Sequence, residues 1–166
     1  KKKKNLTSTS ASNQLVLVAM RDIALSRSLR VFMQFIVNID VKEIGKAISF
    51  YESGLGLQLI RRLFGGMVAE MGGGPASIYL IEQPNASVAA PDTSLQRDYK
   101  RHWTPVHLDF IVEDIDSAVE QVVSVGAVQE GVIKTFDWGM LATMSDPFGN
   151  GFCLLAFAEG GYDHIE

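Results

Sequence analysis

Two stretches of the chain alternate apolar and polar residues and then change to a helical spacing. Alternation runs through 35–41 and again through 106–112. A period of two predicts a strand with one buried face, and a spacing of three and four predicts an amphipathic helix. The helical positions are Ile44, Ala47, Ile48 and Tyr51 after the first stretch, and Ile115, Ala118, Val119 and Val122 after the second. Because Val112 follows Val41 by 71 residues, we interpret the pattern as an internal repeat.

The alternation also assigns side chains to faces. Apolar residues from Phe35 to Val41, and from Val106 to Val112, occupy every second position and are expected beneath the helix that follows them. The intervening residues then face away from the helices: Ile36 and Asn38 in the first stretch, His107 and Asp109 in the second.

Strand-like segments follow each predicted helix. They are 58–64, 67–71 and 76–83 with a turn at 72–75, and later 132–136, 140–145 and 151–157 with a turn at 146–150. The sequence therefore predicts an α+β fold of two βαβββ modules, 33–83 and 105–158, joined by a linker at 84–104. An N-terminal extension at 1–32, whose segment 15–31 could form an appended helix, and a C-terminal tail at 159–166 complete the expected organisation.

Charge is distributed unevenly along this 166-residue chain. Residues 1–32 carry seven basic groups and one acid, a net charge of +6, whereas 33–166 carry eight basic and 18 acidic groups, a net charge of −10. An acidic body repels phosphate backbones, so we expect no nucleic-acid partner and a small ligand that is cationic or neutral. No apolar run approaches the roughly 20 residues of a membrane span. We therefore expect a cytoplasmic protein without a membrane partner.

Three motifs bear on the family of the chain: VKEIGKAISFYESGLGL at 41–57, HLDFIVEDIDSAV at 107–119 and DPFGNGFCLL at 146–155. Together they resemble the vicinal oxygen chelate superfamily, which includes glyoxalase I, bleomycin-resistance proteins and extradiol dioxygenases. The resemblance implies that the two modules pair their sheets into a U-shaped cleft that holds a ligand. It also implies that metal-dependent members carry a His on the first strand and a Glu on the last strand of each module.

The ligand positions implied by the resemblance are only partly filled. His107 stands at one of them, but Ile36 occupies the equivalent position of the first module and Cys153 stands where metal-dependent members have Glu. In the first module the last-strand position is expected at Leu80, or at Glu82 if the register slips by two. His107 and Glu82 alone do not supply the three or four ligands of a divalent cation. We expect no cofactor, with a divalent metal as the less favoured alternative.

Several residues are candidates for ligand binding. His107 beside Asp109 on one strand face would make an acid-base or cation-binding pair, with His107 the candidate catalytic residue if a reaction occurs. Asn38 is the repeat equivalent of Asp109, and Trp103 and Trp138 could stack on a planar ligand. Each also has a purely structural interpretation as a satisfied polar group or a core aromatic. Cys153 is expected to be a small buried apolar residue, since no basic neighbour is apparent.

Three functions fit these features. The first, which we favour, is a metal-independent binding protein that sequesters a cationic or planar compound, similar to the bleomycin-resistance branch, with the antibiotic-resistance role that this resemblance implies. The second is a metal-dependent lyase, isomerase or dioxygenase of glyoxalase type that uses His107. The third is an interaction module whose cleft is filled by Ile36, Leu80 and their neighbours. Open sheet edges also predict a homodimer.

Overall fold

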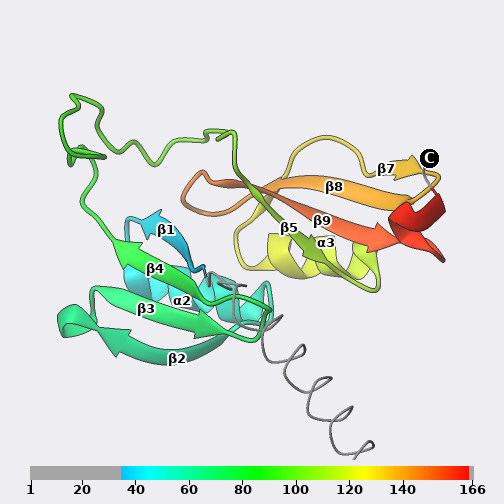
Figure 1. Cartoon of the computed structure of the whole chain (residues 1–166), viewed down its shortest axis with the longest axis horizontal. Helices are drawn as coiled ribbons and strands as arrows, with labels where there is room; N and C mark the ends of the chain where they lie inside the picture. The colour runs from blue at the N-terminus through cyan, green and yellow to red at the C-terminus, as the bar shows by residue number, and fades with distance from the viewer. Residues whose placement is uncertain (1–34, 165–166) are drawn as a thin grey trace, which may run out of the picture. The chain divides into compact units, whose positions relative to one another are not determined.

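The computed structural model describes residues 35–164 (Figure 1). Two repeats of strand, helix and further strands follow one another along the chain. The first contains β1 (Val37–Val41), α2 (Ile44–Ser53), β2 (Gln58–Leu63), the 3-10 turn η1 (Phe64–Gly66), β3 (Val68–Gly72) and β4 (Ile78–Glu82). The second contains β5 (Leu108–Ile111), α3 (Ile115–Ser124), β6 (Val128–Gln129), β7 (Lys134–Phe136), β8 (Gly139–Ser145), β9 (Gly151–Phe157) and the 3-10 turn η2 (Gly161–His164).

Each repeat builds one mixed sheet. The first sheet has the strand order β1-β4-β3-β2, and the second has β5-β9-β8-β6 with β7 also paired to β8. In each sheet the first strand pairs parallel with the last strand, β1 with β4 and β5 with β9, while the other pairs are antiparallel. The predicted α+β class with two mixed sheets is therefore confirmed. The strand expected at 132–136 is the shorter β7, and β6, which also pairs with β8, was not predicted.

The helices pack their apolar stripes against the sheets. In α2 the buried residues include Ile44, Ala47, Ile48 and Tyr51, and in α3 they include Ile115, Val119 and Val122. Residues of both repeats belong to one hydrophobic cluster. The rings of Phe50 and Phe152, one from each repeat, lie 6.4 Å apart within it. The two repeats thus share a core.

The helix starts are stabilised in different ways. In α3 the N-cap is Asp114, whose Oδ1 accepts a hydrogen bond from the Ser117 amide at 2.7 Å. In α2 the N-cap Glu43 makes no such bond, and Glu82 of β4 accepts from the Ile44 amide at 2.9 Å instead. The first helix is therefore capped by the strand beside which it packs.

The predicted strand faces hold within β1 and β5. Val37, Ile39, Leu108 and Phe110 pack against the core. Phe35 and Val106 depart from the prediction, because they are 73% and 81% exposed. Both precede the first residue of their strands, so the pattern extended two residues beyond the hydrogen-bonded pairs that place a side chain on a sheet face.

The segment 84–104 is held by side chains although it forms no extended strand. Arg97 Nε lies 2.6 Å from Asp40 Oδ2 of β1, and the Tyr99 hydroxyl donates to the Gln83 carbonyl at 2.9 Å. The His102 amide donates to the Gly149 carbonyl at 3.0 Å. The predicted extension at 1–32, including the helix at 15–31, lies outside the described residues. In the described part of the chain, no helix has the length and apolar character needed to cross a membrane.

Candidate functional site

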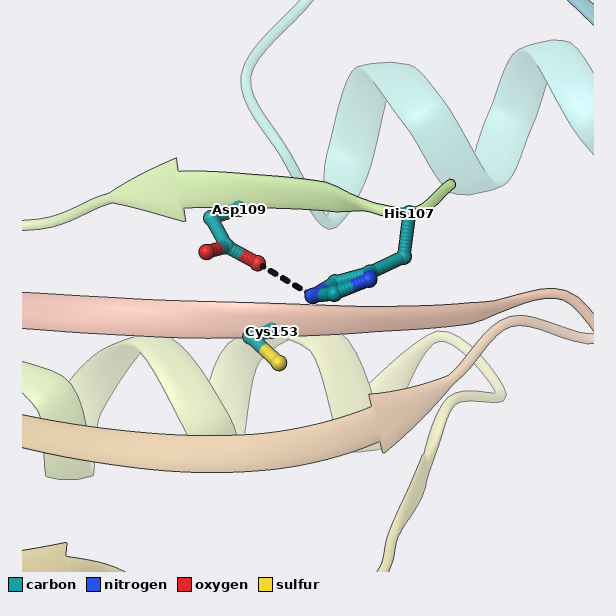
Figure 2. A group of neighbouring side chains, drawn as sticks. All are labelled: His107, Asp109 and Cys153. Carbon is teal, nitrogen blue, oxygen red and sulfur yellow. Dashed lines mark ion pairs between the residues drawn. The ribbon is translucent and has the colours of Figure 1, made fainter. Parts of the chain in front are cut away.

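Three side chains with metal-binding or acid-base chemistry meet on the second sheet. His107 immediately precedes β5, Asp109 lies on β5, and Cys153 pairs with Asp109 across the neighbouring strand β9. Their ligating atoms all lie within 4.8 Å of one another, and His107 Nε2 is 3.2 Å from Asp109 Oδ1 (Figure 2). His107 and Asp109 therefore share one strand face, as their two-residue spacing predicts.

The thiol of this cluster is held in its neutral form. Cys153 is 5% exposed. Burial, and after it the neighbouring Asp109 carboxylate, raise the pKa of its thiol to about 11. Because the thiolate is the nucleophile and the metal ligand, Cys153 is poorly suited to either role in this environment. This agrees with the interpretation of Cys153 as a small buried residue.

Trp103 lies directly beside the cluster. Its ring is 4.6 Å from the His107 ring, and the Arg101 guanidinium lies 5.3 Å from its centre. Gly151 of β9 leaves the space that the indole occupies, since a Cβ at that position would overlap the Trp103 ring. Arg101 is in turn paired with Glu130, which lowers the pKa of the Glu130 carboxyl through their hydrogen bond. The sheet thus positions an aromatic surface next to an imidazole.

A cavity of about 250 Å³ opens where the two repeats meet. Its lining comes from β1, α2 and the residues just after it, the end of the linker, β5, the turn before β9 and the start of β9. The residues are Val37, Asn38, Ile39, Tyr51, Leu55, His102, Thr104, Val106, His107, Leu108, Phe110, Asn150, Gly151 and Phe152. We call this space the seam cavity. It has an apolar floor and a few polar groups at its rim, which is the usual composition of a small-molecule site.

The structure separates the predicted site residues. Asn38 and His107 both line the seam cavity, and Trp103 contacts His107. Asp109 lies 3.2 Å from His107 Nε2 but lines a neighbouring cavity instead. Trp138 lies elsewhere: its ring stacks on Phe136 at 4.9 Å and packs near the far end of β9. The seam cavity therefore unites two of the predicted binding residues, while Trp138 belongs to a separate aromatic cluster.

Three polar residues at the rim of the seam cavity were not among the predicted binding residues. His102 and Thr104 lie in the linker, where no periodicity distinguishes one residue from another, and Asn150 ends the turn at 146–150. The linker reaches the cavity because His102 forms a β-bridge with Asn150. The only signal in the sequence was the proximity of His102 and Thr104 to His107.

The last-strand position of the first module was misassigned. Asn38 pairs with Tyr79 just as Asp109 pairs with Cys153, so Tyr79 rather than Leu80 is the counterpart of Cys153. Leu80 pairs with Ile39 and is fully buried in the core. A shift of one residue moves a side chain to the opposite face of the sheet. Glu82 lies at the end of β4, where it caps α2.

The donor set does not reproduce the metal site that the resemblance implies. In the first repeat Ile36 supplies no ligand, and Tyr79 stands at the position equivalent to Cys153. In the second repeat His107, Asp109 and Cys153 lie close enough to contact one ion, but the thiol would first have to lose a proton that burial retains. Within residues 35–164, these three side chains are the group placed to hold a cation. All three groups belong to the second repeat, whereas the implied metal site takes ligands from both repeats.

Tyr51 connects the seam cavity to the turn before β9. It is 3% exposed, and its hydroxyl donates to Asp146 Oδ2 at 3.2 Å. Asp146 also accepts bonds from the Phe148 amide and from the amide and side chain of Asn150, at 2.8 to 2.9 Å. Burial raises the pKa of Asp146, and burial together with Asp146 raises that of Tyr51. This network fixes the position of Asn150 at the cavity rim.

Comparisons with known proteins agree with this architecture. The sequence profile of a glyoxalase-like domain matches residues 36–155. No protein with a curated description matches the sequence. Among solved structures, the genomically encoded fosfomycin resistance protein FosX from Listeria monocytogenes is similar, with a TM-score of 0.60 at 15% identity, covering 80% of this chain and 98% of that one.

Two further structures show the same fold. An antibiotic binding protein, TnmS3 from Streptomyces sp. CB03234, aligns with a TM-score of 0.52 at 21% identity, covering 78% of this chain and 100% of that one. A glyoxalase/bleomycin resistance protein/dioxygenase family enzyme from Burkholderia phytofirmans PsJN aligns with a TM-score of 0.56 at 16% identity, covering 74% and 97%. These likenesses concern the fold.

Proposed function

The chain belongs to the glyoxalase-like family, and on that premise we propose that it is a small-molecule-binding protein that holds its ligand without a metal ion. The observation that carries the proposal is the seam cavity, to which both repeats contribute an apolar floor and polar rim residues. Such a composition buries the apolar part of a ligand and orients its polar part. The incomplete metal ligand set supports binding without a metal.

The surroundings of the cavity favour a planar or cationic ligand. Trp103 presents an indole that is 47% exposed beside His107, and aromatic faces stack on planar compounds. The Asp109 carboxylate, bonded to His107 and 42% exposed, adds negative charge nearby. The fosfomycin resistance and antibiotic binding proteins that share the fold support a role in antibiotic resistance as the biological setting.

Titration calorimetry against a panel of cationic aromatic compounds tests this proposal. His107→Ala or Asp109→Ala is expected to weaken binding by about 1–3 kcal/mol, the scale of a charge-assisted hydrogen bond. Asp137→Ala, in the exposed turn between β7 and β8, is the matched control and should leave affinity unchanged. Unchanged affinity in both cluster variants would move the site to Trp103 and away from the His107 pair.

A second candidate function rests on the His107, Asp109 and Cys153 cluster. Three potential ligands within 4.8 Å favour a metal-dependent lyase, isomerase or dioxygenase in which His107 would contact the metal or act as a base. Elemental analysis of the purified protein separates the two functions. We expect no stoichiometric metal, whereas one equivalent of nickel, zinc, iron or manganese that is lost in His107→Ala would establish the second function.

The interaction-module hypothesis has less support. It requires a cleft filled by Ile36 and Leu80, but Leu80 lies in the core, Ile36 is 53% exposed, and neither lines the seam cavity. A homodimer and a cytoplasmic location stay predictions. Sedimentation showing only an 18 kDa species at micromolar concentration would contradict the dimer.

A further inference from the structure

We infer that the ligand of the seam cavity presents hydrogen-bond donors to the protein, as an amine or ammonium compound with an apolar planar body does, and not a carboxylate or phosphate. This inference deepens the proposed function and rests on it. It follows from which hydrogen-bonding atoms of the lining residues are already used within the protein and which remain for a ligand.

The two histidines of the cavity each place one ring nitrogen against an acceptor inside the protein. His107 Nε2 lies 3.2 Å from the Asp109 carboxylate, and His102 Nδ1 lies 2.9 Å from the Lys100 carbonyl. Carboxylates and carbonyls only accept, so these nitrogens carry the hydrogen in the neutral rings. The remaining ring nitrogens, Nδ1 of His107 and Nε2 of His102, are then acceptors. Both histidines therefore offer a ligand an acceptor.

Two further rim residues follow the same pattern. Asn150 Nδ2 donates one N–H to Asp146 Oδ2 at 2.8 Å, which leaves the amide oxygen as an acceptor and one N–H as a donor. The Thr104 hydroxyl donates to the Val106 carbonyl, which leaves the lone pairs of its oxygen. Thr104 therefore cannot present its donor to a ligand without breaking a bond within the protein, whereas the amide of Asn150 keeps its second N–H.

The rim consequently offers a ligand more acceptors than donors. Asn38 is the one polar residue of the lining with no internal side-chain bond among the described residues, so its amide can donate as well as accept. No Lys or Arg occurs among the residues that line the cavity. An anionic group would meet these acceptors and only the amide donors of Asn38 and Asn150, with the Asp109 carboxylate 3.2 Å from His107 Nε2. Because an unpaired buried acceptor costs free energy, a ligand with donors is favoured.

A matched series of naphthalene compounds tests the inference: 1-naphthylmethylamine, 1-naphthalenemethanol, 1-methylnaphthalene and 1-naphthoate, each titrated calorimetrically into the full chain. The titrations run at pH 8, where a histidine in water is neutral. The amine should bind at least tenfold more tightly than the methyl compound, the alcohol should fall between them, and the carboxylate should bind weakest. Binding of the carboxylate as tight as that of the amine would overturn the inference while leaving the proposed function intact. Absence of binding by all four compounds at millimolar concentration would overturn both.

Variants at the rim identify the acceptors. Thr104→Val and His102→Phe should each weaken the amine roughly fivefold, as expected for one lost hydrogen bond, and change the affinity for 1-methylnaphthalene less than twofold. Thr135→Val, on the exposed face of β7, is the control for the threonine change. Equal losses for the amine and the methyl compound would show that the rim only shapes the cavity, which contradicts the inference. Unchanged amine affinity in both variants would contradict it as well.

Discussion

The two repeats place the same cross-strand row of residues on the face opposite their helices, and they use it differently. The first-sheet row runs Asn38, Tyr79, Glu70, Arg61, and the second-sheet row runs Asp109, Cys153, Thr143. The first ends in the ion pair of Arg61 with Glu70, whose Arg61 side chain is 60% exposed. The second-sheet row contains the buried thiol of Cys153 beside the Asp109 carboxylate. The His107 side chain reaches this pair from the residue just before β5.

The difference shows that the repeat conserves positions and not chemistry. Pairing between the first and last strands fixes where Asn38 and Asp109 stand, so the backbone supplies two equivalent sites. The two sites differ in what covers them. In the second repeat Trp103 lies over Gly151 beside the row, whereas Ser77 holds the equivalent position in the first repeat.

The largest expected difference concerns the turns that precede the last strands. Asp146 accepts four hydrogen bonds in the second repeat, whereas the turn at 72–75 has no comparable carboxylate. Asp146→Ala should lower the free energy of unfolding by about 3–5 kcal/mol, because several buried donors lose their acceptor. Pro75→Ala should change it by less than about 1 kcal/mol. Urea unfolding measures both, and similar losses in the two variants would contradict the comparison.

The next prediction compares the rows through thiol reactivity. With a pKa of about 11, the Cys153 thiol should react with a disulfide reagent at pH 8 roughly 200-fold more slowly than a free cysteine, from its thiolate fraction alone. A cysteine introduced by Tyr79→Cys in a Cys153→Ala background occupies the half-buried counterpart position and should react faster. Stopped-flow labelling compares them. Equal rates would mean that the two rows are equally shielded.

A smaller effect is expected where the indole meets the second sheet. Gly151→Ala puts a methyl group where the Trp103 ring lies, so it should displace the ring and cost about 1–3 kcal/mol. Ser77→Ala, at the equivalent position of the first repeat, should cost less than about 0.5 kcal/mol. A Trp138→Phe background leaves Trp103 as the only tryptophan, and its emission should shift to longer wavelength in Gly151→Ala. An unshifted emission would show that Trp103 does not rest on Gly151.

The smallest effect concerns pH. The Arg101 hydrogen bond lowers the pKa of Glu130 in the folded protein, so its contribution is present above the unfolded pKa, near 4.3, and is lost as pH falls through the folded pKa. The free energy of unfolding should therefore fall less steeply below pH 5 in Glu130→Gln than in the wild type. The difference should be less than about 1 kcal/mol, as for a solvent-exposed ion pair. The matched control is Glu70→Gln, which removes the ion pair of Glu70 with Arg61 in the first sheet. This variant should leave Trp103 fluorescence unchanged. Thermal melts from pH 3 to 7 give the comparison.

The sequence was sufficient for features with a period. Alternation placed Val37 and Phe110 against the core and put His107 and Asp109 on one face, because side chains alternate strictly along a strand. Register between strands was harder. Tyr79, and not Leu80, belongs to the row because the loop after β3 determines the register of β4 against β1. That loop has no repeating pattern from which the register could be predicted.

The cavity rim was the part that sequence reasoning could not assemble. His102 and Thr104 lie in a linker without periodicity, and they reach the cavity through a bridge to Asn150 from a turn far along the chain. Trp138 matched the expected aromatic chemistry but lies in another cluster, with Phe136 and Tyr162. Residue type alone indicates what a side chain can bind, whereas its neighbours depend on tertiary contacts.

The hydrogen bond between Tyr51 and Asp146 joins the two repeats, so we expect that the chain cannot be divided between them into two independently stable proteins. Each repeat has its own strands and helix, so cutting within 84–104 suggests two half-sized proteins that could be produced and combined separately. Yet the Tyr51 hydroxyl from the first half is buried against a carboxylate of the second, and separation would expose the shared apolar core of both. A single half is therefore expected to be unstable alone, and two halves should recover the fold only by associating with each other.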